Sequence, residues 1–298
     1  MFRSRTLDRL FRQAVSAIDS GDVTTLERLL AEHPRLVRER LKAPGAWLRD
    51  SVGGALKRFF RQPYLLWFVA EDPVRNGKLP GNIGQVTRVI IRAAEREGAE
   101  TLPEQLNYAL RLVAWSGVAA EYGVQIELID ILVDAGASPD GVAENALVNG
   151  HVAAAERLIE RGASLTLATA LCLGRWRDAR RLAEDASAND KKDALVLAAL
   201  NGNAEALRTL IDVGVDLNTP STNIYSHATP LHHAVCSGSL DAVKVLVEAG
   251  ADLRTRDRVE RATALGWAEY YRGEHKTDER GQHFGEIAAY LREKDTPA

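Results

Sequence analysis

The sequence predicts an all-α protein, built as a solenoid of about eight stacked helix pairs. Apolar segments with helical periodicity recur in pairs along the 298 residues, and a glycine separates the members of many pairs. The glycines recur at a fixed spacing, since 36 residues separate both Gly202 from Gly238 and Gly214 from Gly250. A repeat of this length is typical of solenoids, in which each unit buries its apolar face only against its neighbours.

The clearest unit spans residues 229–253. It begins with Thr-Pro-Leu-His, has Gly238 between two short apolar segments, and ends with Gly-Ala-Asp. The glycine suits a turn that needs a positive φ, and the proline suits the first turn of a helix. Thr263 opens the next unit, 34 residues after Thr229.

This unit resembles an ankyrin repeat, whose period is about 33 residues and whose signature is T-P-L-H. The resemblance is strong for residues 190–270 and weaker towards the N-terminus, and the array is similar to divergent ankyrin proteins of bacteria. It implies a curved stack with β-turn fingers, whose concave face is formed by the fingers and the first helices. It also implies protein binding as the usual role, and no catalytic residue.

We expect one domain over residues 1–298, with two interruptions. An irregular long finger is predicted at 34–62, where the spacing between helices exceeds that of a normal finger. A charged segment almost free of apolar residues predicts a loop insertion at 272–283.

Composition limits the cellular setting. No apolar run exceeds the length of residues 64–70, which is far shorter than the ~20 residues of a membrane helix, so no membrane partner is expected. The two cysteines, Cys172 and Cys236, form no disulfide framework and favour the cytoplasm. Arginine outnumbers lysine by 30 to 8, which together with abundant alanine suggests a bacterial source.

Positive charge gathers at the N-terminus. Residues 1–62 carry 13 Lys and Arg against 7 Asp and Glu, whereas residues 63–298 carry 25 against 34. The predicted finger combines this charge with aromatic side chains, and its candidate binding residues are Trp47, Arg58, Phe59, Phe60 and Arg61. They suit phosphates and stacked bases, or an acidic protein. Alternatively, the aromatic residues pack the finger onto the stack and the arginines are solvated.

A second candidate surface follows from the resemblance, which places finger residues and the last residues of each first helix on the concave face. Tyrosine and arginine commonly dominate binding energy at interfaces. The alternative is that Tyr270 and Tyr271 only cover the last unit. The candidate residues are Tyr225, Ser226, Cys236, Ser237, Arg256, Arg258, Tyr270 and Tyr271.

We do not expect a metal site, although the last repeats contain four possible ligands: His227, His232, His233 and Cys236. Zinc requires four protein ligands, or three and a water molecule, and in the family that the unit resembles His232 has a structural role. The sequence also lacks the phosphate-loop, H-E-x-x-H, G-x-S-x-G and dinucleotide-binding patterns. No metal and no small-molecule cofactor are therefore predicted.

The expected function is that of a non-catalytic scaffold, adaptor or inhibitor that binds another protein. One alternative is a nucleic-acid-associated protein that uses the basic, aromatic residues 1–62. A second alternative is an enzyme with an unrecognised site.

Overall fold

The computed structural model describes residues 2–296, and for residues 2–5 only the backbone. This part of the chain is helical and contains no strand. It divides into two compact units: unit 1 comprises residues up to 146 with 153–164, and unit 2 comprises residues 147–152 with those from 165 onward. The expectation of one domain over the whole chain stays a prediction, and each unit is described by itself.

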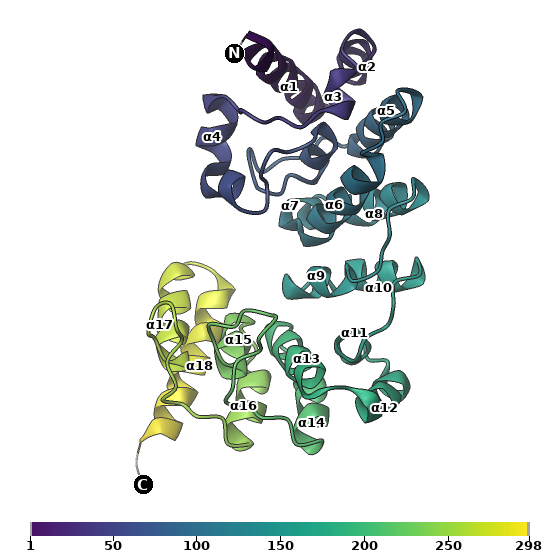
Figure 1. Ribbon diagram of the computed structural model, residues 1–298. Helices are drawn as coiled ribbons and strands as arrows, with labels where there is room; N and C mark the ends of the chain where they lie inside the picture. The colour runs from purple at the N-terminus through teal and green to yellow at the C-terminus, as the bar shows by residue number, and fades with distance from the viewer. Residues whose placement is uncertain (1, 297–298) are drawn as a thin grey trace. The chain divides into compact units, whose positions relative to one another are not determined.

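Helices follow one another as eight pairs, the predicted number (Figure 1). The first helix of the second pair is the 3-10 helix η2, and α7 is an extra turn in the third pair. The fourth pair is α9 (Ala143–Val148) and α10 (Val152–Glu160). The helices before it are α1 (Phe2–Ser20), α2 (Val23–Glu32), α3 (Arg35–Arg38), α4 (Ala46–Val52), η1 (Gly53–Lys57), η2 (Leu65–Ala70), α5 (Ile83–Arg96), α6 (Leu102–Trp115), α7 (Gly117–Glu121) and α8 (Gln125–Asp134).

Unit 2 holds the four remaining pairs. First helices contact first helices, as α13 does with α11 and α15, and second helices contact second helices, as α16 does with α14 and α18 (Figure 1). The helices are α11 (Leu167–Cys172), α12 (Trp176–Asp185), α13 (Ala188–Leu200), α14 (Ala204–Asp212), α15 (Pro230–Cys236), α16 (Leu240–Glu248), α17 (Ala264–Glu274) and α18 (Glu279–Asp295).

Burial explains why these helices need each other. Residues 194–199 of α13 are all buried, because neighbours cover this first helix on several sides. The second helix α16 buries Ala242, Val243, Val245 and Leu246 on one face only. A fully buried valine or leucine side chain contributes about 1.5–3 kcal/mol, so one pair alone would leave much of this stabilisation unrealised.

Turns between paired helices combine a glycine with a capping residue. Gly202 and Gly238 have φ values of +61° and +75°, in the left-handed region that favours glycine. The next residues cap the second helices: Asn203 accepts a hydrogen bond from Ala206 N at 3.0 Å, and Ser239 accepts one from Ala242 N at 3.2 Å. Ser239 Oγ also donates to Gly202 O at 3.2 Å, which joins consecutive repeats.

The Thr-Pro-Leu-His segment also joins repeats, as its resemblance to the family implied. His232 Nδ1 lies 2.7 Å from Thr229 Oγ1, and Nε2 lies 3.1 Å from Ala262 O in the next finger. Because a carbonyl oxygen only accepts, Nε2 carries the proton and Nδ1 accepts from the threonine hydroxyl. The ring is buried and ties one repeat to the next.

The segment at 34–62 is folded rather than open, and contains α3, α4 and η1. Leu41 N donates to Pro63 O at 2.9 Å, which brings the chain after α3 against the residue that follows the segment. Asp8 of α1 holds its middle, accepting hydrogen bonds from Gly45 N at 2.7 Å and Trp47 Nε1 at 2.8 Å. We call residues 34–62 the insertion below.

The prediction of a loop insertion at 272–283 is wrong for most of this segment. Residues 272–274 complete α17, and residues 279–283 begin α18, so only four residues connect the two helices. Asp278 caps α18 by accepting from Gly281 N at 3.2 Å. Charged side chains gave the segment its loop-like composition, but they lie on the exposed faces of two helices, where charge is tolerated.

A buried ion pair fixes the turn that follows η2. Glu71 Oε1 accepts hydrogen bonds from the backbone N–H groups of residues 75, 76 and 77, at 2.7, 2.5 and 3.0 Å. Its Oε2 lies 2.6 Å from Arg75 Nη2, and this guanidinium also donates two hydrogen bonds to Asp19 of α1, at 2.8 and 3.0 Å. The turn is therefore tied to the first helix pair.

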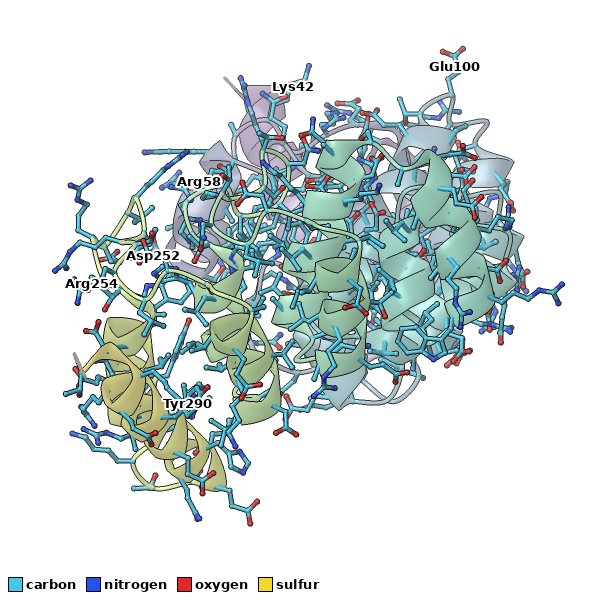
Figure 2. All side chains as sticks on the ribbon, turned by 90° about the horizontal axis from the view of Figure 1, so that it is seen from below. Lys42, Arg58, Glu100, Asp252, Arg254 and Tyr290 are labelled. Carbon is cyan, nitrogen blue, oxygen red and sulfur yellow. The ribbon has the colours of Figure 1, made fainter. Side chains whose placement is uncertain are left out.

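We expect Glu71→Gln to lower the free energy of unfolding by about 2–3 kcal/mol, because it removes one partner of a buried charge pair. Chemical denaturation of the full chain measures this. Glu100→Gln is the matched control, since Glu100 projects into solvent (Figure 2), and it should change stability by less than about 0.5 kcal/mol. An equal effect of both substitutions would contradict the structural role of Glu71.

Candidate interaction surfaces

Exposed tyrosines mark the first candidate surface, which lies in unit 2. Tyr270 is 63% exposed on α17, and Tyr225 is 40% exposed in the finger before α15. Tyr271 is half-buried and stacks on Phe284 of α18, with ring centroids 5.2 Å apart. The rings of Tyr270 and Tyr271 are 5.5 Å apart and inclined by 69°. Tyr271 thus belongs to the packing of the last pair, and Tyr270 projects from it.

A fixed tryptophan supports these tyrosines. Trp267 Nε1 donates to Asp257 Oδ2 at 3.1 Å, and its ring lies nearly perpendicular to that of Tyr271 at 6.3 Å. Trp267, Tyr270 and Tyr271 line a pocket of about 410 Å³ together with Glu260, Ala262 and Gly266. The pocket therefore has aromatic walls whose positions the fold determines.

Asp257 organises the finger beside this pocket. It is buried and accepts hydrogen bonds from the backbone N–H groups of residues 259, 260 and 262, at 2.8, 2.7 and 3.0 Å. Burial alone would raise the pKa of its carboxyl, but these hydrogen bonds and that of Trp267 lower the pKa to about 2. The carboxylate stays charged and holds the finger in one shape.

Histidines and Tyr225 form the base of the preceding finger. The Tyr225 ring lies 5.7 Å from that of His233 and 5.9 Å from that of His227. Burial, and to a lesser extent the neighbouring His227 and His232, lower the pKa of His233 to about 4. Burial also lowers the pKa of His232 and raises that of Tyr225. The two buried imidazoles are therefore neutral at pH 7.

The other residues expected on this surface differ in exposure. Arg256, Arg258 and Ser226 are exposed, and Arg256 donates to Arg261 O at 2.8 Å. Ser237 is half-buried and donates to Ala234 O at 2.7 Å, so its hydroxyl serves the turn. Cys236 is exposed, and its Sγ lies 3.4 Å from Tyr271 Oη. Burial of the Tyr271 hydroxyl raises the pKa of Tyr271, and the contact with Cys236 raises it further.

Two residues proposed from the insertion as binding residues are packed instead. Phe60 is buried against Phe68 and Trp67, at ring distances of 5.3 and 6.2 Å. Trp47 stacks on Phe68 at 6.3 Å and is bound by Asp8. The expectation of binding is wrong for Phe60, because its burial in the core leaves no ring surface for a partner.

Arg58, Phe59 and Arg61 remain at the surface and border a groove of about 420 Å³ in unit 1. Figure 2 shows Arg58 among the exposed side chains. Opposite them, α6 contributes Glu104, Asn107, Tyr108 and Arg111, and Arg40 and Trp67 complete the lining. Phe59 is 43% exposed, and its ring stacks on that of Trp115 at 6.5 Å. We call this the arginine groove.

Sequence reasoning missed the contribution of α6. Asn107, Arg111 and Trp115 are spaced by four residues, which places them on one helical face, and all three are exposed. The spacing was visible in the sequence. Its meaning was not, because only the folded insertion brings Phe59 against this face.

Several arginines of the insertion have acidic partners. Arg35 pairs with Glu39 at 2.6 Å, Arg38 with Glu97 at 3.4 Å, and Arg40 with Glu104. Arg40 also lies over the Tyr64 ring, 4.3 Å from its centroid. Three of the eight basic side chains in residues 34–62 therefore have an acidic side chain beside them.

The described residues contain neither a cluster of metal ligands nor a membrane-spanning helix. Within residues 2–296, no three His, Cys, Asp or Glu side chains are grouped so that they could hold a metal ion. In the same part of the chain, no helix combines the length and apolar character needed to cross a bilayer. Neither Cys172 nor Cys236 forms a disulfide.

Comparison with known proteins places the chain among repeat proteins. A family model for ankyrin repeats, in three copies, matches residues 146–257. Among solved structures, the ankyrin repeat domain of human ASB11 matches with 17% identity, over 78% of this chain and 98% of that domain, at a TM-score of 0.36. Because that superposition is loose, the assignment depends on the repeat match. No curated protein sequence matches the chain.

The chain therefore contains ankyrin repeats, which the family model places at residues 146–257. Ankyrin repeats are in general modules for protein–protein interaction and in general not enzymes. Repeats of this kind vary their surface residues while their core positions keep the fold.

Acidification should destabilise the protein through His232 and His233. Their pKa values in the folded state lie below the ordinary 6.5, so between about pH 6.5 and pH 4 the unfolded chain binds more protons. Stability from neutral burial is present above pH 6.5 and is lost as pH falls, by about 2–3 kcal/mol for His233 at pH 4.

Denaturation of the His233→Gln variant across this pH range tests the expectation. The variant should be less stable at pH 7 but should show a shallower fall in the free energy of unfolding. His283→Gln is the control, because His283 is exposed, and should keep the original pH dependence. A slope unchanged in His233→Gln would contradict the assignment.

Proposed function

We propose that this protein is a cytoplasmic, non-catalytic scaffold, adaptor or inhibitor, and that it binds a partner protein on the tyrosine-bearing surface of unit 2. The observation that carries this is the exposure of Tyr270 and Tyr225 above a rigid aromatic base. Side chains of this kind, fixed before binding, lose little conformational entropy when a partner covers them.

The chemistry of the surface supports a protein partner. Tyr270 offers apolar area and a hydroxyl, and the adjoining pocket of about 410 Å³ accepts a side chain between aromatic walls. Arg256 and Arg258 are exposed and add positive charge in the same finger as Glu260 and Ala262 of the pocket lining. Tyrosine, tryptophan and arginine are enriched among the residues that dominate binding energy, and such residues cluster near the centres of protein interfaces.

Nucleic-acid binding by residues 1–62 receives less support. Arg35, Arg38 and Arg40 pair with acidic side chains, and Phe60 is unavailable for stacking on bases. A nucleic-acid surface needs positive charge along the path of the phosphates.

The test is affinity purification with the full chain as bait, from lysate of the cells that express it. Proteins enriched by the wild type should be depleted about tenfold or more by Tyr225→Ala with Tyr270→Ala, because losing a hot-spot tyrosine costs more than about 1 kcal/mol. Tyr122→Ala is the matched control, since Tyr122 is 44% exposed in unit 1. Equal enrichment by all three baits would contradict the proposed surface.

A further inference from the structure

The arginine groove contains positive charge without a partner. Among the described residues, no acidic side chain forms an ion pair with Arg58, Arg61 or Arg111. All three are exposed, and they border one groove from two sides, the insertion and α6. Like charges held close together repel one another, so this arrangement costs stability until an anion arrives.

The acidic residue in the lining is already engaged. Glu104 pairs with Arg40 and accepts a hydrogen bond from Tyr64 Oη at 3.2 Å. Its charge is therefore compensated by Arg40, and the groove keeps an excess of positive charge.

The groove offers mainly hydrogen-bond donors to a ligand. Guanidinium groups only donate. Asn107 Oδ1 accepts a hydrogen bond from Ser138 N at 2.8 Å, which leaves the Nδ2 donors of this amide for a ligand. A donor-rich lining selects a ligand rich in acceptors, such as carboxylates and peptide carbonyls.

The backbone that carries these arginines is held in place. Phe60 is buried in the core of unit 1, and its N–H donates to Ala55 O at 2.9 Å. The hydroxyl of Tyr108 on α6 donates to Phe59 O. Arg58, Phe59 and Arg61 therefore flank an anchored residue, and their Cα positions are determined before any ligand binds.

An apolar contact adjoins the charges. Phe59 and Trp115 stack with an interplanar angle of 22° and are both exposed, so together they present an aromatic face to solvent. Such a face takes up an apolar side chain. The groove thus combines a site for anions with a site for an apolar group.

We propose that the arginine groove binds an acidic peptide segment of a partner protein, whose carboxylates pair with Arg58, Arg61 and Arg111 and whose apolar side chain packs on Phe59 and Trp115. A volume of about 420 Å³ accepts a few residues of an extended peptide. The site lies in unit 1 and outside residues 146–257, so it is independent of the tyrosine-bearing surface of unit 2.

Three fluorescent probes test the proposal by anisotropy on the full chain at low salt. The first is a peptide of alternating glutamate pairs and phenylalanines. In the second, lysines replace the glutamates, and the third is an oligouridylate. The first should bind with the highest affinity, and the lysine peptide should not bind.

The groove variant combines Arg58→Gln, Arg61→Gln and Arg111→Gln. It should weaken binding of the glutamate peptide by about tenfold or more, given the modest energy of each exposed ion pair. The control variant combines Lys42→Gln, Arg49→Gln and Lys57→Gln, which removes the same charge from exposed positions of the insertion outside the groove. It should change affinity less than threefold, which is on the order of a screened long-range charge effect. Circular dichroism confirms folding of both.

Three outcomes would overturn the proposal: no binding of the glutamate peptide, equal loss in both variants, or tighter binding of the oligouridylate. Equal loss would show diffuse attraction to the insertion, and tighter RNA binding would assign the groove to nucleic acid. None of these outcomes bears on Tyr225 and Tyr270, whose substitution is assayed separately.

Discussion

Burial of one-sided helices against their neighbours is the constraint on which this structure depends. A helix such as α16 has a single apolar face, and it gains stability when its partner α15 and the neighbouring second helices α14 and α18 cover that face. First helices such as α13 are covered on several sides, and residues 194–199 of this helix are correspondingly apolar all round. Apolar burial alone does not determine how one repeat is aligned with the next. Hydrogen bonds between repeats, from Ser239 to Gly202 and from His232 to Ala262, fix this alignment.

The insertion obeys the same constraint by a different route. Residues 34–62 have no repeat partner, so they bury Leu48, Phe60 and much of Trp47 against the first two helix pairs. Their charged residues point outward as a consequence of this packing. Arg38 and Arg40 lie near acidic residues and form ion pairs with Glu97 and Glu104. Arg58 and Arg61 border the groove with Arg111 of α6 and have no acidic partner among the described residues.

Much of the fold was predictable because it is local. The glycine turns, the capping residues and the T-P-L-H segment act within about one repeat, and the sequence shows them directly. The loop expected at 272–283 was wrong because charged helices with one narrow apolar stripe resemble loops in composition. Ion pairs such as Arg40–Glu104 join residues far apart in sequence, and no pattern of spacing predicts them.

The candidate binding residues were likewise predictable from the sequence only in part. Tyr225 and Tyr270 were predictable from repeat register, because equivalent positions in successive repeats have equivalent exposure. The sequence could not predict that Phe59 is exposed and Phe60 is buried, because two adjacent phenylalanines differ only in the direction in which the folded backbone points them. The α6 face became visible only when the insertion folded against it.

Asp257 accepts hydrogen bonds from three backbone N–H groups and one indole, and so meets the conformational needs of its finger with one side chain. The side chains of the flanking Arg258 and Val259 are exposed. Substitutions there can alter what the finger recognises while the turn persists. In evolutionary terms, the finger separates the residue that conserves geometry from those free to diverge, so new specificities can arise without a new fold.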